Sequence, residues 1–173
     1  ADTWWMGLTP RLDWPEGFKK LVSDRERKGF NVIQIVCGPF PGFCATEAAW
    51  DPQQANEGGW SWEKEWTQIN PNYFNYADRR IMLLVNRGIV PCIVGMWGYY
   101  LPFMGIDNAK KHWRYLVARY GAYPVVWCLA GEGRMPTYAF HGNPRERERH
   151  RRIQIEGWTE VGRYVKRIDP YKN

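Results

Sequence analysis

The sequence predicts an α/β fold, in which buried strands alternate with amphipathic helices along one domain of residues 1–173. Two observations lead to this prediction. Three continuous apolar runs, typical of strands buried on both faces, each follow a helical stretch and a glycine. The helical stretches repeat their apolar residues every 3.6 positions. Such alternation predicts parallel strands with right-handed crossovers, either in a doubly wound open sheet or in a (β/α)8 barrel.

The elements are expected in the order α-β-α-β-α-β-α after a short opening segment. The opening ADTWW is expected to be the tail of a first strand. The three strand-like runs are GFNVIQIVC (29–37), GIVPCIVG (88–95) and GAYPVVWCLAG (121–131). Four helices are expected. The first begins near Asp13 and Pro15, and the second carries an apolar stripe of Phe74, Ala77, Ile81, Leu84 and Val85. The third starts at Asp107 as N-cap, and the last spans 144–168.

No glycine-rich phosphate-binding fingerprint follows any of these strands. The barrel is therefore favoured over a nucleotide-binding open sheet. Four βα units make about half of a barrel, so the chain is expected to be the N-terminal half. Its first and last strands would then be exposed edges. We expect it to pair with a missing C-terminal half-barrel, to self-associate or to aggregate.

Charge and cysteine content argue against several function classes. The net charge is +6, but the basic run at 145–152 begins with alternating signs, as a solvated helix start does. The four cysteines lack zinc spacing, and no His and carboxylate spacing suggests a metal. No apolar run is long enough to cross a membrane. The expected partners therefore include no metal, no cofactor, no nucleic acid and no membrane.

The loops after the strands carry the candidate chemistry. They are long and rich in tryptophan, whereas the links from helix to strand are short. In a βα barrel the active site is built at the carboxyl ends of the strands. There the third apolar run ends at Glu132, between Gly131 and Gly133, which are expected to leave room for a ligand to approach the backbone. Its carboxylate is either a partly desolvated general acid or an ordinary loop glutamate paired with Arg134.

Long motifs give the chain a resemblance to a known family. ADTWW, DRERKGFNVIQIV, YADRRIMLLVNRGIVPCIVGMWG, GIDNAKKHWRYLVARYGAYPVVWCLAGE and VKRIDP resemble the N-terminal half of the apiosidase-like glycoside hydrolases. The resemblance implies a (β/α)8 barrel that hydrolyses glycosidic bonds in poly- or oligosaccharides. It also implies a secreted or periplasmic location. Carried over, Glu132 ends strand four and is the acid/base of a retaining-type enzyme.

The chain departs from related barrel glycosidases in two ways. Many of them have an asparagine directly before the acid, where this chain has Gly131. Their second carboxylate comes from strand seven, which lies outside this chain, although hydrolysis ordinarily needs two carboxylates about 5 to 9 Å apart. A non-catalytic carbohydrate-binding module built on a half-barrel is therefore the alternative interpretation.

Further residues are expected to contact the carbohydrate. Aromatic rings pack against sugar faces, and polar side chains bond hydroxyl groups. The candidates are Asp2, Trp4, Trp5, Gln34, Trp60, Trp97, Tyr99, Tyr100, Arg134 and His141. His112 and His150 are expected to be solvated, and Trp127 is expected to pack against helices on the face opposite Glu132.

Overall fold

The computed structural model describes residues 1–40, 50–136 and 142–173 of the chain. It contains four parallel strands in the order β1-β2-β3-β4 and a helix after each strand, which confirms the predicted alternation. The strands are β1 (Asp2–Thr3), β2 (Val32–Val36), β3 (Val90–Val94) and β4 (Val126–Cys128). The helices are α1 (Glu16–Arg27), α2 (Pro71–Asn86), α3 (Leu101–Met104), α4 (Ile106–Tyr120) and α5 (Pro144–Ile168).

Short 3₁₀ turns shape the long loops. They cover Pro52–Gln54 and Lys64–Trp66 after β2, and Gly98–Tyr100 after β3. In the part of the chain that the structure describes, no helix is long and apolar enough to cross a membrane.

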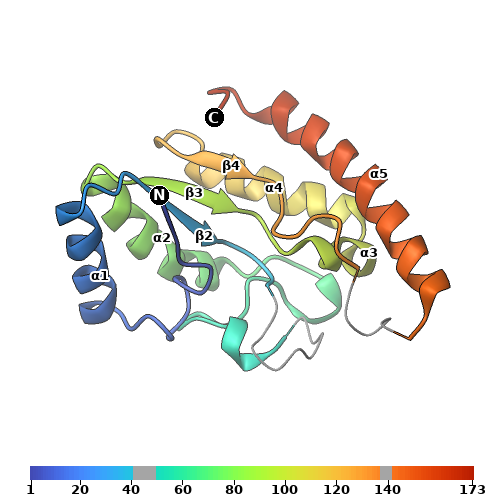
Figure 1. Cartoon of the computed structure of the whole chain (residues 1–173), viewed down its shortest axis with the longest axis horizontal. Coiled ribbons are helices and arrows are strands. Elements are labelled where there is room, and N and C mark those ends of the chain that lie inside the picture. Colours follow the sequence, from blue (N-terminus) through green and yellow to red (C-terminus); the bar gives the residue numbers. More distant parts are fainter. Residues whose placement is uncertain (41–49, 137–141) are drawn as a thin grey trace.

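The two faces of the sheet differ in what covers them. Ile33 lies opposite Pro91, and Ile93 lies opposite Trp127, so these side chains share the face that packs against the helices. The Trp127 ring lies 5.7 Å from Trp113 of α4, which confirms that Trp127 packs against helices. Figure 1 shows α2 and α4 behind the strands. The helices therefore cover one face of the sheet, and the opposite face is the one that would line a barrel interior.

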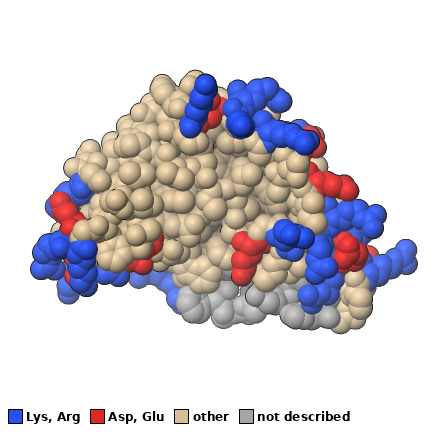
Figure 2. Space-filling model, turned by 45° about the horizontal axis from the view of Figure 1, so that its top comes forward, with Lys and Arg blue, Asp and Glu red and all other residues tan. Residues whose placement is uncertain are grey.

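The helix-free face is partly open in this chain. Thr3, Gln34, Cys92 and Val126 lie side by side across the four strands on this face. Val126 is 46% exposed, although it lies in a strand of the sheet. Figure 2 shows a broad area without Lys, Arg, Asp or Glu, with charged side chains gathered around its rim. An open apolar strand position of this kind is what the half-barrel prediction expected.

Helix boundaries follow local sequence signals, with one correction. Gly29 and Gly88 adopt positive φ angles of 75° and 69° after α1 and α2, as helix-terminating glycines do. The last helix spans the predicted 144–168. Asp107 is not an N-cap, because α4 begins at Ile106 and Gly105 occupies the cap position. Asp107 is instead an acidic residue of the first turn, where it complements the helix dipole.

Two histidines that were expected to be solvated are buried. His112 is fully buried, although it lies in an exposed-looking charged stretch of α4. Its Nδ1 accepts the indole N–H of Trp62 at 3.0 Å, so its Nε2 carries the proton and donates to the Gly95 carbonyl at 2.8 Å. His150 is 6% exposed and packs against Phe103. The prediction failed because neighbouring charges in the sequence lie on the other faces of each helix.

Candidate functional site

The candidate site lies at the carboxyl edge of the sheet. Trp5 follows β1, Trp97 follows β3 and Glu132 follows β4, each within a few residues of the strand end. Parallel strands bring their carboxyl ends to one edge, so these three residues meet although they are far apart in sequence. The Trp5 and Trp97 rings lie 5.2 Å apart in an edge-to-face arrangement. Trp5 is 40% exposed, whereas Trp97 is 9% exposed.

Glu132 is held by a hydrogen bond from Trp97. The indole Nε1 of Trp97 donates to the Oε2 oxygen of Glu132 at 2.8 Å. The backbone of Glu132 has a φ of 48°, which non-glycine residues rarely adopt. A turn follows, in which the N–H of Met135 donates to the Glu132 carbonyl at 3.0 Å. The orientation of the carboxylate is thus set by this turn and by Trp97, because regular strand alternation ends at Cys128.

The glycines around Glu132 accommodate protein atoms. A Cβ atom on Gly131 would lie 2.4 Å from the Trp97 ring, and one on Gly98 would lie 2.4 Å from the Cα of Gly133. Trp97 and Gly131 also form a parallel bridge, in which Gly98 N–H donates to the Gly131 carbonyl at 2.6 Å. Gly131 therefore stands where an asparagine side chain would collide with the indole. The sequence alone suggested clearance for a ligand, and the structure shows clearance for Trp97.

Arg134 does not form the ion pair that was the alternative role for Glu132. Within the described residues no salt bridge joins the two side chains, and Arg134 is exposed. It borders a depression of about 510 Å³ between the Glu132 turn and α5, lined also by Gln154 and Trp158. The Gln154 Nε2 donates to the Met135 carbonyl at 2.7 Å, and the Trp158 indole donates to the Gly98 carbonyl at 3.3 Å.

Gln154 and Trp158 are supporting residues that the sequence analysis missed. Both lie on α5, and both bond the loops that carry Glu132 and Trp97. Gln154 is fully buried, so an amide there has to be held by a specific partner. The sequence signal that could have pointed to Gln154 is its helical spacing from Trp158 and Val161, which places it on the apolar stripe of α5.

Asp2 lies away from the carboxyl edge. It pairs in register with Ile33, near the start of β2, and its Oδ2 accepts hydrogen bonds from Arg25 at 2.5 Å and from the Trp4 indole at 2.8 Å. Burial raises the pKa of Asp2, but the hydrogen bonds from Arg25 and Trp4 outweigh it, so the pKa is lowered overall. Asp2 therefore links β1 to α1, and its expected contact with a sugar does not fit this position.

Several of the expected aromatic contacts are core residues. Trp4 is 7% exposed and packs edge-on against Phe18, while Tyr99 and Tyr100 are each 1% exposed. The Tyr100 hydroxyl donates to the Phe40 carbonyl at 3.2 Å. These rings offer no free face to a sugar, because the high aromatic content builds the core beneath the loops. Among the candidate rings, Trp5 combines exposure with proximity to Glu132 through Trp97.

The remaining candidates are distributed between the sheet and the loops. Gln34 lies on the helix-free face, where its Oε1 accepts from the Thr3 hydroxyl at 3.4 Å. Trp60 is half-buried in the loop after β2, and its indole donates to the Asp51 carbonyl at 2.9 Å. His141 lies outside the described residues. Contact of Gln34 or Trp60 with carbohydrate stays a prediction.

The loop after β2 also carries acidic residues, and glycoside hydrolysis ordinarily requires a second carboxylate near the acid. Glu57 is engaged elsewhere, because Arg80 of α2 binds both of its oxygens, at 2.8 and 3.2 Å. The Arg80 side chain is fully buried, and this pair anchors the loop to α2. Glu63 and Glu65 are exposed. Among the described residues, no group of three or more His, Cys, Asp or Glu side chains could hold a metal ion.

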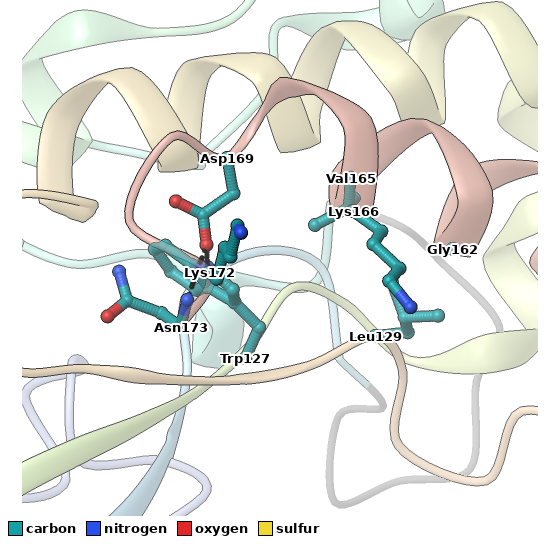
Figure 3. Close-up of a pocket in the computed structure, with 8 residues that line it drawn as sticks. All are labelled: Trp127, Leu129, Gly162, Val165, Lys166, Asp169, Lys172 and Asn173. Atoms are coloured by element: carbon teal, nitrogen blue, oxygen red, sulfur yellow. Dashed lines mark hydrogen bonds between the residues drawn. The ribbon is translucent and has the colours of Figure 1, made fainter.

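A second cavity lies away from Glu132. It measures about 340 Å³ and lies between β4 and the end of α5 (Figure 3). Trp127 and Leu129 line one side, and Val165, Lys166 and Asp169 line the other. Asp169 accepts hydrogen bonds from the Trp127 indole at 2.9 Å and from the Asn173 N–H at 2.8 Å. This cavity lies beside β4, which within the described residues pairs only with β3.

The fold matches those of known glycoside hydrolases. Similar solved structures include a glycoside hydrolase with a TM-score of 0.69 and 21% identity, and a glycoside hydrolase family 5 protein from Bacteroides vulgatus with 0.68 and 18%. A third is an aphid myrosinase, with a TM-score of 0.57 and 15% identity. The alignments cover 97%, 98% and 88% of this chain, but 34%, 33% and 32% of the matched chains. The chain therefore folds as a half-barrel of the glycoside hydrolase type and spans about a third of the length of these structures.

The family itself is shown by the sequence. A model of the apiosidase-like catalytic domain matches residues 1–172. The chain belongs to the apiosidase-like family, as the motifs had suggested. No match was found among curated protein sequences.

Proposed function

We propose that this chain supplies the N-terminal half of a glycoside hydrolase barrel, in which Glu132 is the acid/base of a retaining mechanism. The observation that carries the proposal is the carboxylate of Glu132, which is exposed after β4 at the carboxyl edge and is held by the Trp97 indole. Membership in the apiosidase-like catalytic-domain family supports the proposal that the chain is part of a glycoside hydrolase. The substrate class is a poly- or oligosaccharide, and Trp5 is the ring best placed to receive a sugar beside the acid.

The chemistry assigns one role to Glu132 in each of two steps. In the first step the protonated carboxylic acid donates its proton to the glycosidic oxygen while the bond from that oxygen to the sugar breaks. In the second step the carboxylate accepts a proton from the water that releases the sugar. The nucleophile in this mechanism is a second carboxylate, which we place outside the chain on a later strand.

Substitution of Glu132 tests the assignment. In the protein at its full natural length, we expect Glu132→Gln to lower kcat/KM about 10²–10⁴-fold on a glycoside with a poor leaving group. An aryl glycoside with a dinitrophenolate leaving group needs little protonation, so its kcat/KM should change far less. Equal turnover of wild type and variant on the poor leaving group would refute Glu132 as the acid.

A carbohydrate-binding module is the second candidate. It is favoured by the engagement of Glu57 with Arg80, which removes one loop acid as a partner for Glu132. Isothermal titration with oligosaccharides, run beside an assay for released reducing sugar, separates the two functions. Binding without release at full natural length would support the module and would contradict hydrolysis.

The open sheet supports a proposal about the partner as well. We propose that the remaining half of a (β/α)8 barrel covers the helix-free face and adds a strand to β4. The matched structures are about three times as long as this chain, and the alignments cover 97% and 98% of this chain. The uncharged area in Figure 2 and the cavity between β4 and α5 in Figure 3 are the surfaces that such a half would cover.

A further inference from the structure

Trp97 does more than border the candidate site, because the only polar atom of its side chain donates a hydrogen bond to the candidate acid. The indole N–H points at Oε2 of Glu132, and the two residues are 35 positions apart in sequence. An indole N–H is a donor and never an acceptor. The oxygen that it binds must therefore act as an acceptor in both protonation states of the carboxyl group.

The indole is fixed in place from several sides. The backbone N–H of Trp97 donates to the Pro39 carbonyl at 2.7 Å, and the Gly131 N–H donates to the Met96 carbonyl at 3.0 Å. One face of the ring lies against Gly131, where no Cβ would fit. Trp5 packs against the ring at 5.2 Å. A side chain held in this way presents its N–H in one direction.

Glu132 needs such a fixed partner. A glutamate has three side-chain torsions, and an exposed one samples several rotamers, which costs free energy when a reaction requires a single position. Its backbone is already confined by the left-handed φ of 48° and by the turn to Met135. The indole bond confines the other end of the side chain, at Oε2.

We infer that Trp97 is a positioning residue for acid catalysis, which holds Oε2 of Glu132 as an acceptor and so places the transferable proton on Oε1. This inference rests on the proposed function of Glu132. In the acid step the proton leaves Oε1 for the glycosidic oxygen, and that oxygen takes the electron pair of the breaking bond. In the base step the proton from water returns to Oε1.

The test compares two leaving groups in the protein at its full natural length. Dinitrophenyl and phenyl glycosides of the same sugar are used, and the sugar is the one that wild type cleaves fastest in a dinitrophenyl panel. We expect Trp97→Phe to lower kcat/KM about 10–100-fold on the phenyl glycoside and less than about threefold on the dinitrophenyl glycoside. A loss of sugar binding would instead lower both values equally.

A matched control removes the same kind of bond elsewhere. Trp127→Phe deletes an indole donor to the Asp169 carboxylate on the helix side of the sheet, and we expect it to leave the ratio of the two kcat/KM values unchanged. Gly131→Ala is the second variant of the site, because its Cβ would displace the Trp97 ring while every hydrogen-bonding side chain remains. It should reproduce the leaving-group dependence of Trp97→Phe, and it decides the question if Trp97→Phe does not fold.

The outcomes separate this inference from the proposed function. If Glu132→Gln shows the leaving-group dependence but folded Trp97→Phe and Gly131→Ala keep the wild-type ratio, positioning by Trp97 is wrong and the acid role of Glu132 stands. If Glu132→Gln also keeps the wild-type ratio, the proposed function fails. The inference is supported if Glu132→Gln, Trp97→Phe and Gly131→Ala all lose more kcat/KM on the phenyl than on the dinitrophenyl glycoside. Trp127→Phe must at the same time keep the wild-type ratio.

Discussion

Trp62 and His112 are joined by a buried hydrogen bond of 3.0 Å that links the long loop after β2 to helix α4. The other ring nitrogen of His112 bonds the Gly95 carbonyl at the end of β3. The loop, the helix and the strand end thus share one neutral imidazole. A proton on Nδ1 would break this arrangement, because it would face the indole N–H of Trp62.

This arrangement predicts acid sensitivity of the fold. Burial lowers the pKa of His112 from 6.5 to about 4, partly offset by the bond to Gly95. The unfolded chain binds a proton below pH 6.5 and the folded chain does not, so stability is lost as the pH falls from 6.5 towards 4. We expect the free energy of unfolding to be about 2 kcal/mol lower at pH 5 than at pH 7 from this group alone. Urea unfolding of wild type and His112→Gln at both values measures it, and an equal pH dependence in the two proteins would contradict it.

The ion pair between Arg80 and Glu57 predicts a stability effect. The Arg80 guanidinium is fully buried and binds both oxygens of a carboxylate that is about one-third exposed. We expect Glu57→Gln to lower the free energy of unfolding by about 1–3 kcal/mol, because a buried cation loses its counter-charge. Urea unfolding measures the effect. Glu63→Gln, in an exposed position of the same loop, should change stability by less than about 0.5 kcal/mol.

Close packing at the end of β3 predicts that Gly95 cannot be enlarged. A Cβ atom there would lie 2.4 Å from the Trp113 ring, which is itself fully buried. We expect Gly95→Ala to lower the free energy of unfolding by about 1–3 kcal/mol. Gly142→Ala is the control, since among the described residues no atom beyond its chain neighbours lies within 4 Å of its added Cβ. Equal midpoints of thermal unfolding in the two variants would refute the packing argument.

The open sheet face predicts association of the isolated chain. The face carries Val126 at 46% exposure, in a row with Cys92 and Gln34. We expect residues 1–173 alone to dimerise or aggregate in size-exclusion chromatography with light scattering, and Val126→Lys to weaken this association. Tyr123→Lys, in the turn before β4, should have no such effect. A monomeric wild-type chain would count against an uncovered half-barrel face.

Local sequence patterns were sufficient to predict the order of the elements. The spacing of hydrophobic residues and the helix-terminating glycines involve only neighbours a few positions apart. Both can therefore be recognised in the amino-acid sequence alone. They located β2, β3, β4 and the 144–168 helix, and the barrel interpretation added a first strand at the opening ADTWW, which makes Glu132 follow the fourth strand. The motif resemblance added the family, which the match over 1–172 confirmed.

The contacts between side chains that are distant in sequence follow from the fold and not from local patterns. The bond from Trp97 to Glu132, the burial of His112 and the pairing of Asp2 with Arg25 join residues far apart in sequence. Such contacts depend on strand order, register and the crossing of loops, and none of these leaves a local signal. For the same reason Gly131 suggested space for a ligand in the sequence, whereas the fold fills that space with the Trp97 ring.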